Sequence, residues 1–69
     1  MVDTQHLENI IKEKGIKKSY LADKLGISIQ SLRLKINNIS DFKNTETDTM
    51  CKELGITSLV LKEKIFFKK

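Results

Sequence analysis

The segment from Lys18 to Asn38 has the sequence KSYLADKLGISIQSLRLKINN. Within it, Ala22 stands four residues before Gly26, and Leu32 stands six residues after that glycine. Two short helices that cross closely need a small side chain at their contact, and the turn between them is three or four residues long and usually contains glycine. Apolar residues on both sides of the glycine can fill the wedge between the helices: Leu21, Leu25, Ile27, Leu32 and Ile36. The spacing predicts a helix-turn-helix.

The same possible helix-end signal, a glycine followed by isoleucine, occurs three times along the chain. The pairs are Gly15-Ile16, Gly26-Ile27 and Gly55-Ile56, which include all three glycines. Glycine just past a helix end adopts the left-handed conformation at little cost, and the next apolar residue can fold back on the last turn. Four apolar stripes with helical spacing surround these pairs: Leu7, Ile10 and Ile11; Leu21, Ala22 and Leu25; Ile29, Leu32 and Ile36; Met50, Cys51 and Leu54. We therefore expect four short helices.

Polar residues mark where these helices begin. Asp3 or Thr4 is the candidate N-cap of the first helix, and Ser28 is the candidate N-cap of the third. The sequence Thr45-Glu46-Thr47-Asp48 fits the start signal of a helix before Gly55.

The segment 57–69 is compatible with two structures. Six apolar residues can line a fifth helix begun by Ser58, whereas the alternation over residues 61–65 also suits an edge strand. We favour the helix. The sequence thus predicts one all-α domain over residues 1–69, a compact bundle of four to five short helices with a central helix-turn-helix.

Positive charge is concentrated in the first two-thirds of the chain. The whole chain carries +4, but residues 12–43 contain eight basic residues against three acidic ones. Such a local excess is typical of a surface that binds a polyanion. A lysine-rich solvated surface is the alternative interpretation.

Several functional classes are not expected from this composition. Cys51 and His6 are the single cysteine and histidine, too few for a disulfide or a zinc site. We see no acid–base pair, nucleophile–base pair or glycine-rich phosphate loop, and therefore expect no enzyme, cofactor, metal or small-molecule ligand. Without a secretory signal or an apolar run of about 18–20 residues, we expect a reduced, cytoplasmic protein. Cys51, Tyr20 and the phenylalanines are expected to pack in the core.

The segment Lys18–Asn38 resembles the helix-turn-helix of the phage repressor/Cro family, and the resemblance extends over roughly residues 4–56. It implies a lambda-repressor-like bundle whose second and third helices form the DNA-binding unit. The chain departs from the family pattern in three places. Lys17-Lys18 stand where Ser or Thr followed by Gln is frequent, Thr47 replaces a larger apolar residue, and Leu34 lies where a polar base-reading side chain is often found.

This resemblance implies that the recognition helix is Ser28 to Asn37. Gln30 can form a pair of hydrogen bonds with adenine. Arg33, the single arginine, can form hydrogen bonds with guanine. Ile29 is expected either to contact a thymine methyl group or to be a core residue at the helix start. The alternative for Arg33 is a surface arginine paired with an acid. The expected DNA-facing residues and the flanking phosphate contacts together are Lys18, Ser28, Ile29, Gln30, Ser31, Arg33, Leu34, Lys35, Asn37, Asn38 and Lys43.

We therefore expect a sequence-specific transcriptional regulator of the Cro/repressor type that occludes operator DNA. The rival hypothesis is a protein-interaction module, such as an anti-repressor or adaptor, that keeps this fold without base reading. Leu34 and Ile29 on the outward face favour the rival, whereas Arg33, Gln30 and the local positive charge count against it.

A homodimer is expected as well, because a single short recognition helix reads too few base pairs to be selective. Its expected interface is apolar and lies in the C-terminal segment: Leu59, Leu61, Ile65, Phe66 and Phe67. The competing view is that Phe66 and Phe67 fold back against the first helix.

Overall fold

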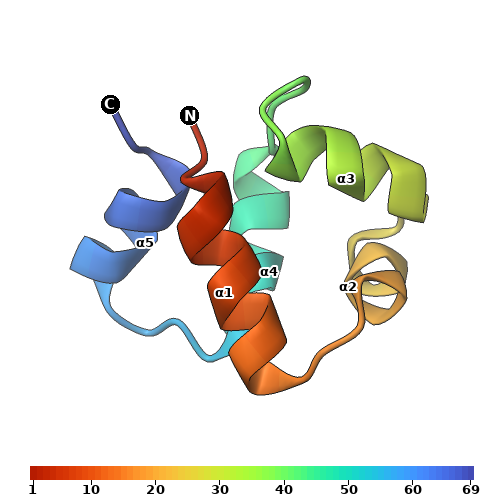
Figure 1. Cartoon of the computed structure of the whole chain (residues 1–69), viewed down its shortest axis with the longest axis horizontal. Helices are drawn as coiled ribbons and strands as arrows, with labels where there is room; N and C mark the ends of the chain where they lie inside the picture. The colour runs from red at the N-terminus through yellow and green to blue at the C-terminus, as the bar shows by residue number, and fades with distance from the viewer.

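The computed structural model of residues 1–69 contains five helices and no strand (Figure 1). The helices are α1 (Thr4–Lys14), α2 (Lys18–Leu25), α3 (Ile29–Ile36), α4 (Asn44–Leu54) and α5 (Leu59–Phe66). The all-α bundle predicted from the sequence is therefore confirmed, and the segment 57–69 forms a helix. None of the five helices is long and apolar enough to cross a bilayer.

Four of the helices end in the same backbone motif. At Gly15, Gly26 and Gly55 the φ angles are 67°, 70° and 69°. In each case the amide of the following isoleucine donates to a carbonyl five residues earlier, as from Ile27 to Ala22 at 3.0 Å. This is the Schellman arrangement, which satisfies carbonyls that a helix end leaves free. The fourth example, at the end of α3, uses Asn38 in place of glycine, with φ of 62°.

The predicted N-caps of α1, α3 and α5 are confirmed, since Asp3, Ser28 and Ser58 each accept a backbone hydrogen bond. The predicted start of α4 is wrong by two positions, because the N-cap is Lys43 and not Thr45. The helix begins at Asn44, and the N–H of Lys43 donates to Glu46 Oε1 at 2.8 Å. The lysine side chain cannot accept a hydrogen bond, so the carboxylate of Glu46 does the capping at this end.

All five helices contribute to one core. It comprises thirteen buried apolar residues: Val2, Leu7, Ile11, Leu21, Ala22, Leu32, Ile36, Met50, Cys51, Leu54, Ile56, Ile65 and Phe66. Burial raises the pKa of the Cys51 thiol, in keeping with its predicted place in the core. Thr47 is also buried, and its hydroxyl donates to the Lys43 carbonyl at 3.2 Å, so this small residue packs without an unpaired polar atom.

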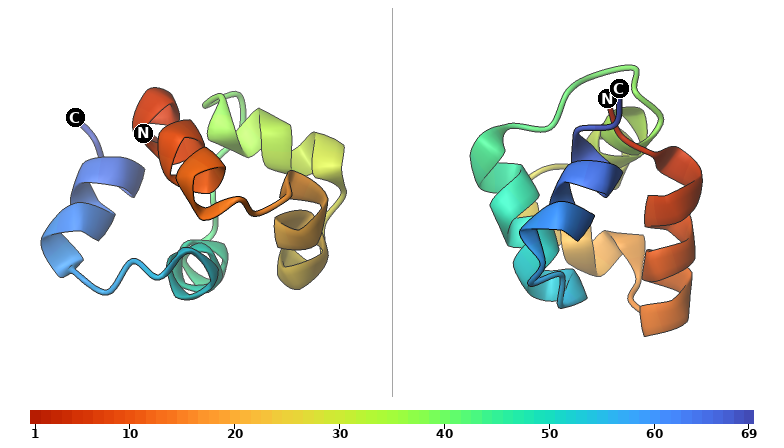
Figure 2. Two further views of the ribbon diagram at one scale, coloured as in Figure 1. Left: turned by 60° about the horizontal axis from the view of Figure 1, so that its bottom comes forward. Right: turned by 90° about the vertical axis from the view of Figure 1, so that its left-hand side faces the viewer.

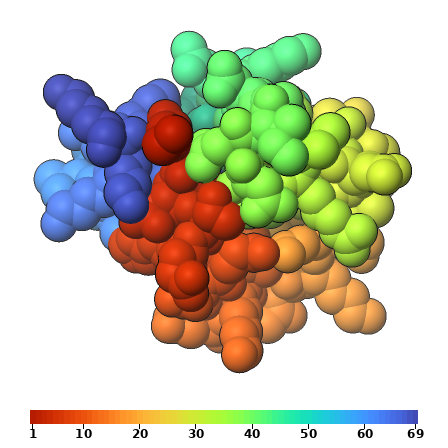
Figure 3. Space-filling model, turned by 45° about the horizontal axis from the view of Figure 1, so that its top comes forward, coloured from red at the N-terminus to blue at the C-terminus, as the bar shows by residue number.

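The two ends of the chain meet on one side of the bundle (Figure 2, right). The N–H of Asp3 donates to the Ile65 carbonyl at 2.6 Å, and the N–H of Lys68 donates to the Met1 carbonyl at 2.8 Å. The N-terminal residues lie between the C-terminal residues and the segment that follows α3 (Figure 3). These contacts bring Val2 into the core beside α5.

This arrangement corrects part of the predicted dimer interface. Ile65 is fully buried and Phe66 is 5% exposed, with its ring edge-on to Phe42 at 5.6 Å between centroids. Both belong to the core of the single chain and are not free to meet a second copy. Phe67 does not fold back with Phe66, because it is 50% exposed.

Candidate nucleic-acid interface

The candidate site lies on α3, which α2 and the turn hold at the surface. The turn is Gly26, Ile27 and Ser28, the length expected for a helix-turn-helix. In Figure 1, α2 is seen end-on while α3 lies across the view, so the two helices cross steeply. Ala22, the small residue predicted for the contact between the two helices, is buried.

The side chains of α3 divide into two faces. Leu32 and Ile36 are buried against the core. The outward face carries the four residues predicted for it, all exposed: Gln30, Arg33, Leu34 and Asn37. Ser28 Oγ accepts from the N–H of Ser31 at 3.0 Å, which fixes the start of the helix at the predicted residue. The Ser28 side chain remains exposed and that of Ser31 is half-buried.

Arg33 has no acidic partner. It takes part in none of the four ion pairs of the chain, and no acidic residue occurs between Lys24 and Ser40. The alternative prediction, an arginine paired with an acid, therefore does not hold. Its guanidinium is free to form a planar, bidentate contact with a ligand.

The same face contains apolar side chains that the bundle does not cover. Ile29 is 37% exposed and Leu34 is 41% exposed, while Ile39, just past the end of α3, is 72% exposed. Ile29 is thus partly buried, so its exposure does not decide between the two predicted roles, core residue and DNA contact. Ile39 contrasts with Ile16, Ile27 and Ile56, which follow the other helix ends and are all at least half-buried. Sequence reasoning placed the end of α3 correctly at Asn37, but it missed the left-handed Asn38 that follows and the exposure of Ile39.

Lys35, predicted as a flanking phosphate contact, is instead paired within the chain. Its Nζ is 2.5 Å from Glu46 Oε1 on α4, and the two side chains are only 11% and 9% exposed. Burial raises the pKa of Glu46, but the bonds from Lys35 and from the Lys43 N–H outweigh it and lower the pKa overall. Lys35 holds α3 to α4, and we remove it from the set of phosphate contacts.

Asn38 also has a structural role in place of the predicted phosphate contact. Its Oδ1 accepts from the N–H of Val2 at 2.7 Å, and its Nδ2 donates to the Val2 carbonyl at 2.8 Å. Thr4 adds a third hydrogen bond between these segments, because its hydroxyl donates to the Ile36 carbonyl at 2.6 Å. The end of α3 is thereby fastened to the start of the chain, which orients the helix on the bundle.

Lys18 and Lys43, the two lysines predicted as phosphate contacts beside the recognition helix, differ in whether they form an ion pair within the chain. Lys18 Nζ lies 2.9 Å from the Glu8 carboxylate, so its charge is partly neutralised within the chain. Lys43 is exposed and belongs to no ion pair. Lys17, which precedes α2 and was not predicted as a contact, is likewise exposed and unpaired. The sequence does not distinguish Lys17 from Lys18, because the contact of Lys18 with Glu8 is visible only in the structure.

Tyr20 does not pack in the core as predicted. It is 45% exposed on α2, and its hydroxyl donates to Glu53 Oε1 on α4 at 2.7 Å. That hydrogen bond to a carboxylate raises the pKa of Tyr20. Lys24 Nζ sits 5.4 Å from the centre of the ring, within the range of a cation–π contact.

Comparisons with protein-family models, with curated protein sequences and with solved structures found no match to this chain, so the site rests on its own residues.

Proposed function

We propose that this chain is a sequence-specific DNA-binding transcriptional regulator of the Cro/repressor type, with α3 inserted into the major groove. One observation carries the proposal: the exposed face of α3 holds Gln30 and an unpaired Arg33 in a stretch without acidic residues. An α-helix fits the major groove of B-DNA, and these two side chains match the edges of adenine and guanine there.

The apolar residues of the face have a role in the same complex. Ile29 and Leu34 are partly exposed beside Gln30 and Arg33. Apolar side chains contact the 5-methyl group of thymine, which only the major groove displays. The proposed site therefore prefers thymines next to the bases that Gln30 and Arg33 read.

Phosphate contacts would come from the residues around α3 that remain free. Lys43 and Lys17 carry unpaired charges, and the hydroxyls of Ser28 and Ser31 stand at the start of the recognition helix. Lys18 contributes less, because Glu8 competes for its ammonium group. Such contacts position the helix without reading sequence. The bound protein would act by occlusion, on DNA in the cytoplasm.

A second candidate function is a protein-interaction module built on the same fold. The observation that favours it is the exposure of Ile29, Leu34 and Ile39 around α3. Apolar groups at the centre of a surface are typical of protein contacts. Arg33 would then serve as an anchor of that contact, since arginine is enriched at such positions.

Selection of bound duplexes from a random DNA pool, followed by a salt titration on the enriched sequence, tests the proposal. We expect an enriched motif containing guanine, adenine and thymine. The affinity should fall steeply with salt, because counterions are released from the neutralised phosphates. No enrichment, with weak binding to all DNA, would contradict the proposal and favour the protein-interaction module.

A further inference from the structure

The last turn of α3 obtains one of its hydrogen bonds from a distant part of the chain. The last four carbonyls of an α-helix have no partner within the helix. In α3, the carbonyls of residues 33–35 accept from N–H groups of residues 37–40, which follow the helix directly. The carbonyl of Ile36 accepts instead from the hydroxyl of Thr4, at the start of α1. Thr4 therefore completes the end of the recognition helix.

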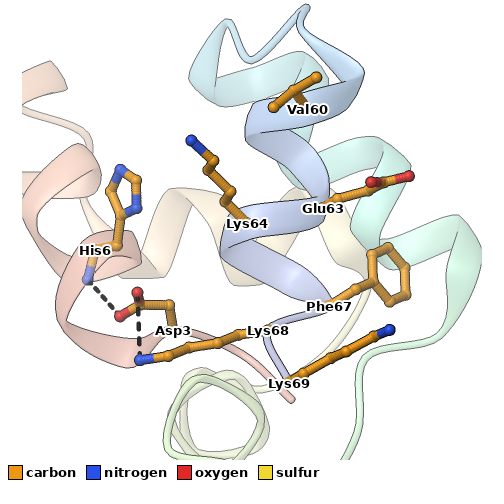
Figure 4. Close-up of a pocket in the computed structure, with 8 residues that line it drawn as sticks. All are labelled: Asp3, His6, Val60, Glu63, Lys64, Phe67, Lys68 and Lys69. Carbon is orange, nitrogen blue, oxygen red and sulfur yellow. Dashed lines mark hydrogen bonds and ion pairs between the residues drawn. The ribbon is translucent and has the colours of Figure 1, made fainter.

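The backbone that carries Thr4 is itself held in place. Figure 4 shows the carboxylate of Asp3 between the start of α1 and the end of the chain. The N–H of His6 donates to Asp3 Oδ1 at 3.2 Å, and Lys68 Nζ lies 3.6 Å from Asp3 Oδ2. The N–H of Asp3 also donates to the Ile65 carbonyl in α5. Because its neighbour is bonded to α1 and to α5 at once, Thr4 presents its hydroxyl to α3 from a fixed position.

The far end of α3 has few other supports. The main helix contact of α3 is with α2, on the other side of the turn. At its C-terminal end, Ile36 is buried in the core and Lys35 is paired with Glu46 on α4. The remaining supports are the hydrogen bond from Thr4 and those between Asn38 and the N-terminal segment. These hydrogen bonds join the end of α3 to the start of α1, whereas the ion pair joins it to α4.

A small tilt at this end of α3 becomes a large displacement at the base-reading side chains. Gln30 lies six residues before Ile36, which is about 9 Å along the helix. A tilt of about 10° about Ile36 moves the backbone at Gln30 by about 1.5 Å. Hydrogen-bond lengths vary only between about 2.7 and 3.2 Å, so paired bonds to a base do not survive such a movement. A lysine has a flexible stem and can still reach a phosphate.

We propose that Thr4 is a positioning residue for base reading, because its hydroxyl, together with the Asn38 amide, sets the angle at which α3 meets the DNA. The inference rests on the proposed function and adds to it a residue outside the recognition helix. Loss of the hydroxyl leaves the Ile36 carbonyl without its donor and lets the end of α3 tilt. The contacts of Gln30 and Arg33 with base edges are then weakened, whereas the phosphate contacts persist.

Hydrogen exchange of the DNA-free chain, followed by NMR, tests the link between Thr4 and the end of α3. T4V removes the hydroxyl and keeps a branched side chain of similar shape. The N–H groups of residues 37–40 should exchange about tenfold faster in T4V, because one lost hydrogen bond makes local opening easier by about that factor. T4S should restore the rates of the unaltered chain. T49V is the matched control, because the Thr49 hydroxyl also donates to a carbonyl, that of Thr45 at 3.0 Å, but within α4.

Fluorescence anisotropy at fixed salt, on the selected duplex and on random DNA, tests the effect on base reading. T4V should bind the selected duplex about tenfold more weakly than the unaltered chain, because a paired contact with a base is lost. T4S and T49V should bind it as the unaltered chain does. Affinity for random DNA and the salt dependence should be the same in all four chains, because none of the changes removes a positive charge. Circular dichroism checks that each chain is folded at the temperature of the measurement.

Exchange rates in T4V equal to those of the unaltered chain would overturn the inference. Equal losses of affinity on the selected duplex and on random DNA would overturn it too, since a smaller folded fraction lowers both alike. A T4V chain that keeps full affinity for the selected duplex would overturn the inference and leave the proposed function intact. If the unaltered chain selects no duplex, the proposed function fails and the inference fails with it.

Discussion

Arg33 is the residue at which DNA reading and simple charge attraction can be separated. Substitution by lysine keeps the positive charge but removes the planar fork that bonds guanine through two hydrogen bonds. We expect R33K to lose about 1–3 kcal/mol of binding free energy on the selected sequence and almost nothing on random DNA. Q30A should show the same selective loss at a different base pair. Equal losses on both kinds of DNA would assign the two residues to the phosphate backbone. The measurement is fluorescence anisotropy at fixed salt, with K52A as the control for lost charge.

Glu46 belongs to the most buried of the four ion pairs of the chain. Its pKa is lower in the folded chain than in the unfolded one, so its contribution is present above the ordinary range of a glutamate and is lost as the pH falls through the lowered value. At neutral pH, E46Q should reduce the free energy of unfolding by about 1–3 kcal/mol, because Lys35 is left without its carboxylate. Near about pH 3 the difference from the unaltered chain should shrink, because the glutamate of the unfolded chain is then mostly protonated.

Urea unfolding at the two pH values measures this effect. D48N is the matched control, because the Asp48–Lys62 pair has an Asp48 side chain that is 68% exposed and should contribute little. A loss in E46Q that is the same at both pH values would show that the charge of Glu46 is not its cause.

At the scale of the elements, the contacts that hold the end of α3 in place were the least predictable feature of the site. The sequence predicted the helix from Ser28 to Asn37, and the structure begins and ends it there, with both residues as caps. Three helix ends were visible as Gly-Ile pairs. Asn38-Ile39 forms the same Schellman arrangement at the end of α3 without glycine. Contacts between distant segments were hidden too, because nothing in the local pattern shows that Asn38 bonds Val2 or that Lys35 pairs with Glu46. Local preference fixes where a helix ends, whereas tertiary packing decides which polar side chains remain free.

Asn38 yields a prediction at this scale. Asparagine tolerates the left-handed conformation, and its amide also joins α3 to the N-terminal segment. N38G should keep the backbone conformation but lose both hydrogen bonds, which lowers the free energy of unfolding by about 1–3 kcal/mol. N38A should cost about 1 kcal/mol more, because alanine is strained at positive φ. Chemical unfolding ranks the three chains, and an alanine variant as stable as the glycine variant would show that the left-handed conformation is not what limits this position.

At the scale of the whole molecule, α5 was predicted as a helix, but two of the residues expected to form its dimer interface lie in the core. Its apolar bulk suggested a surface for a second copy, yet Ile65 and Phe66 complete the core of the single chain. The reason lies at the other end of the sequence, where Val2 and Asp3 pack and bond alongside α5. Periodicity cannot show that segments more than sixty residues apart will meet.

Removal of the last residues should therefore act on folding before it acts on association. A chain ending after Lys64 loses two buried side chains, each of which contributes about 2–5 kcal/mol, and should be unfolded at room temperature. A chain ending after Phe66 keeps both and should remain folded, though less stable because the Lys68–Met1 hydrogen bond is absent. Circular dichroism distinguishes the two truncations. A folded chain lacking residues 65–69 would show that α5 is dispensable for the core.

The pairing of Met1 with Lys68 also means that the order of the elements along the chain can be changed without changing their places. A short peptide linking the two ends would close the backbone into a ring, and the exposed residues Thr57 and Ser58 offer a site at which to open it again. In such a circular permutant α5 would be synthesised first and α4 last. The Asp3–Ile65 contact, which now closes one of the two longest loops of the molecule, would then become a local one. Loop closure of that length is a main entropic barrier to folding, so the permutant should fold faster than the natural order of the chain.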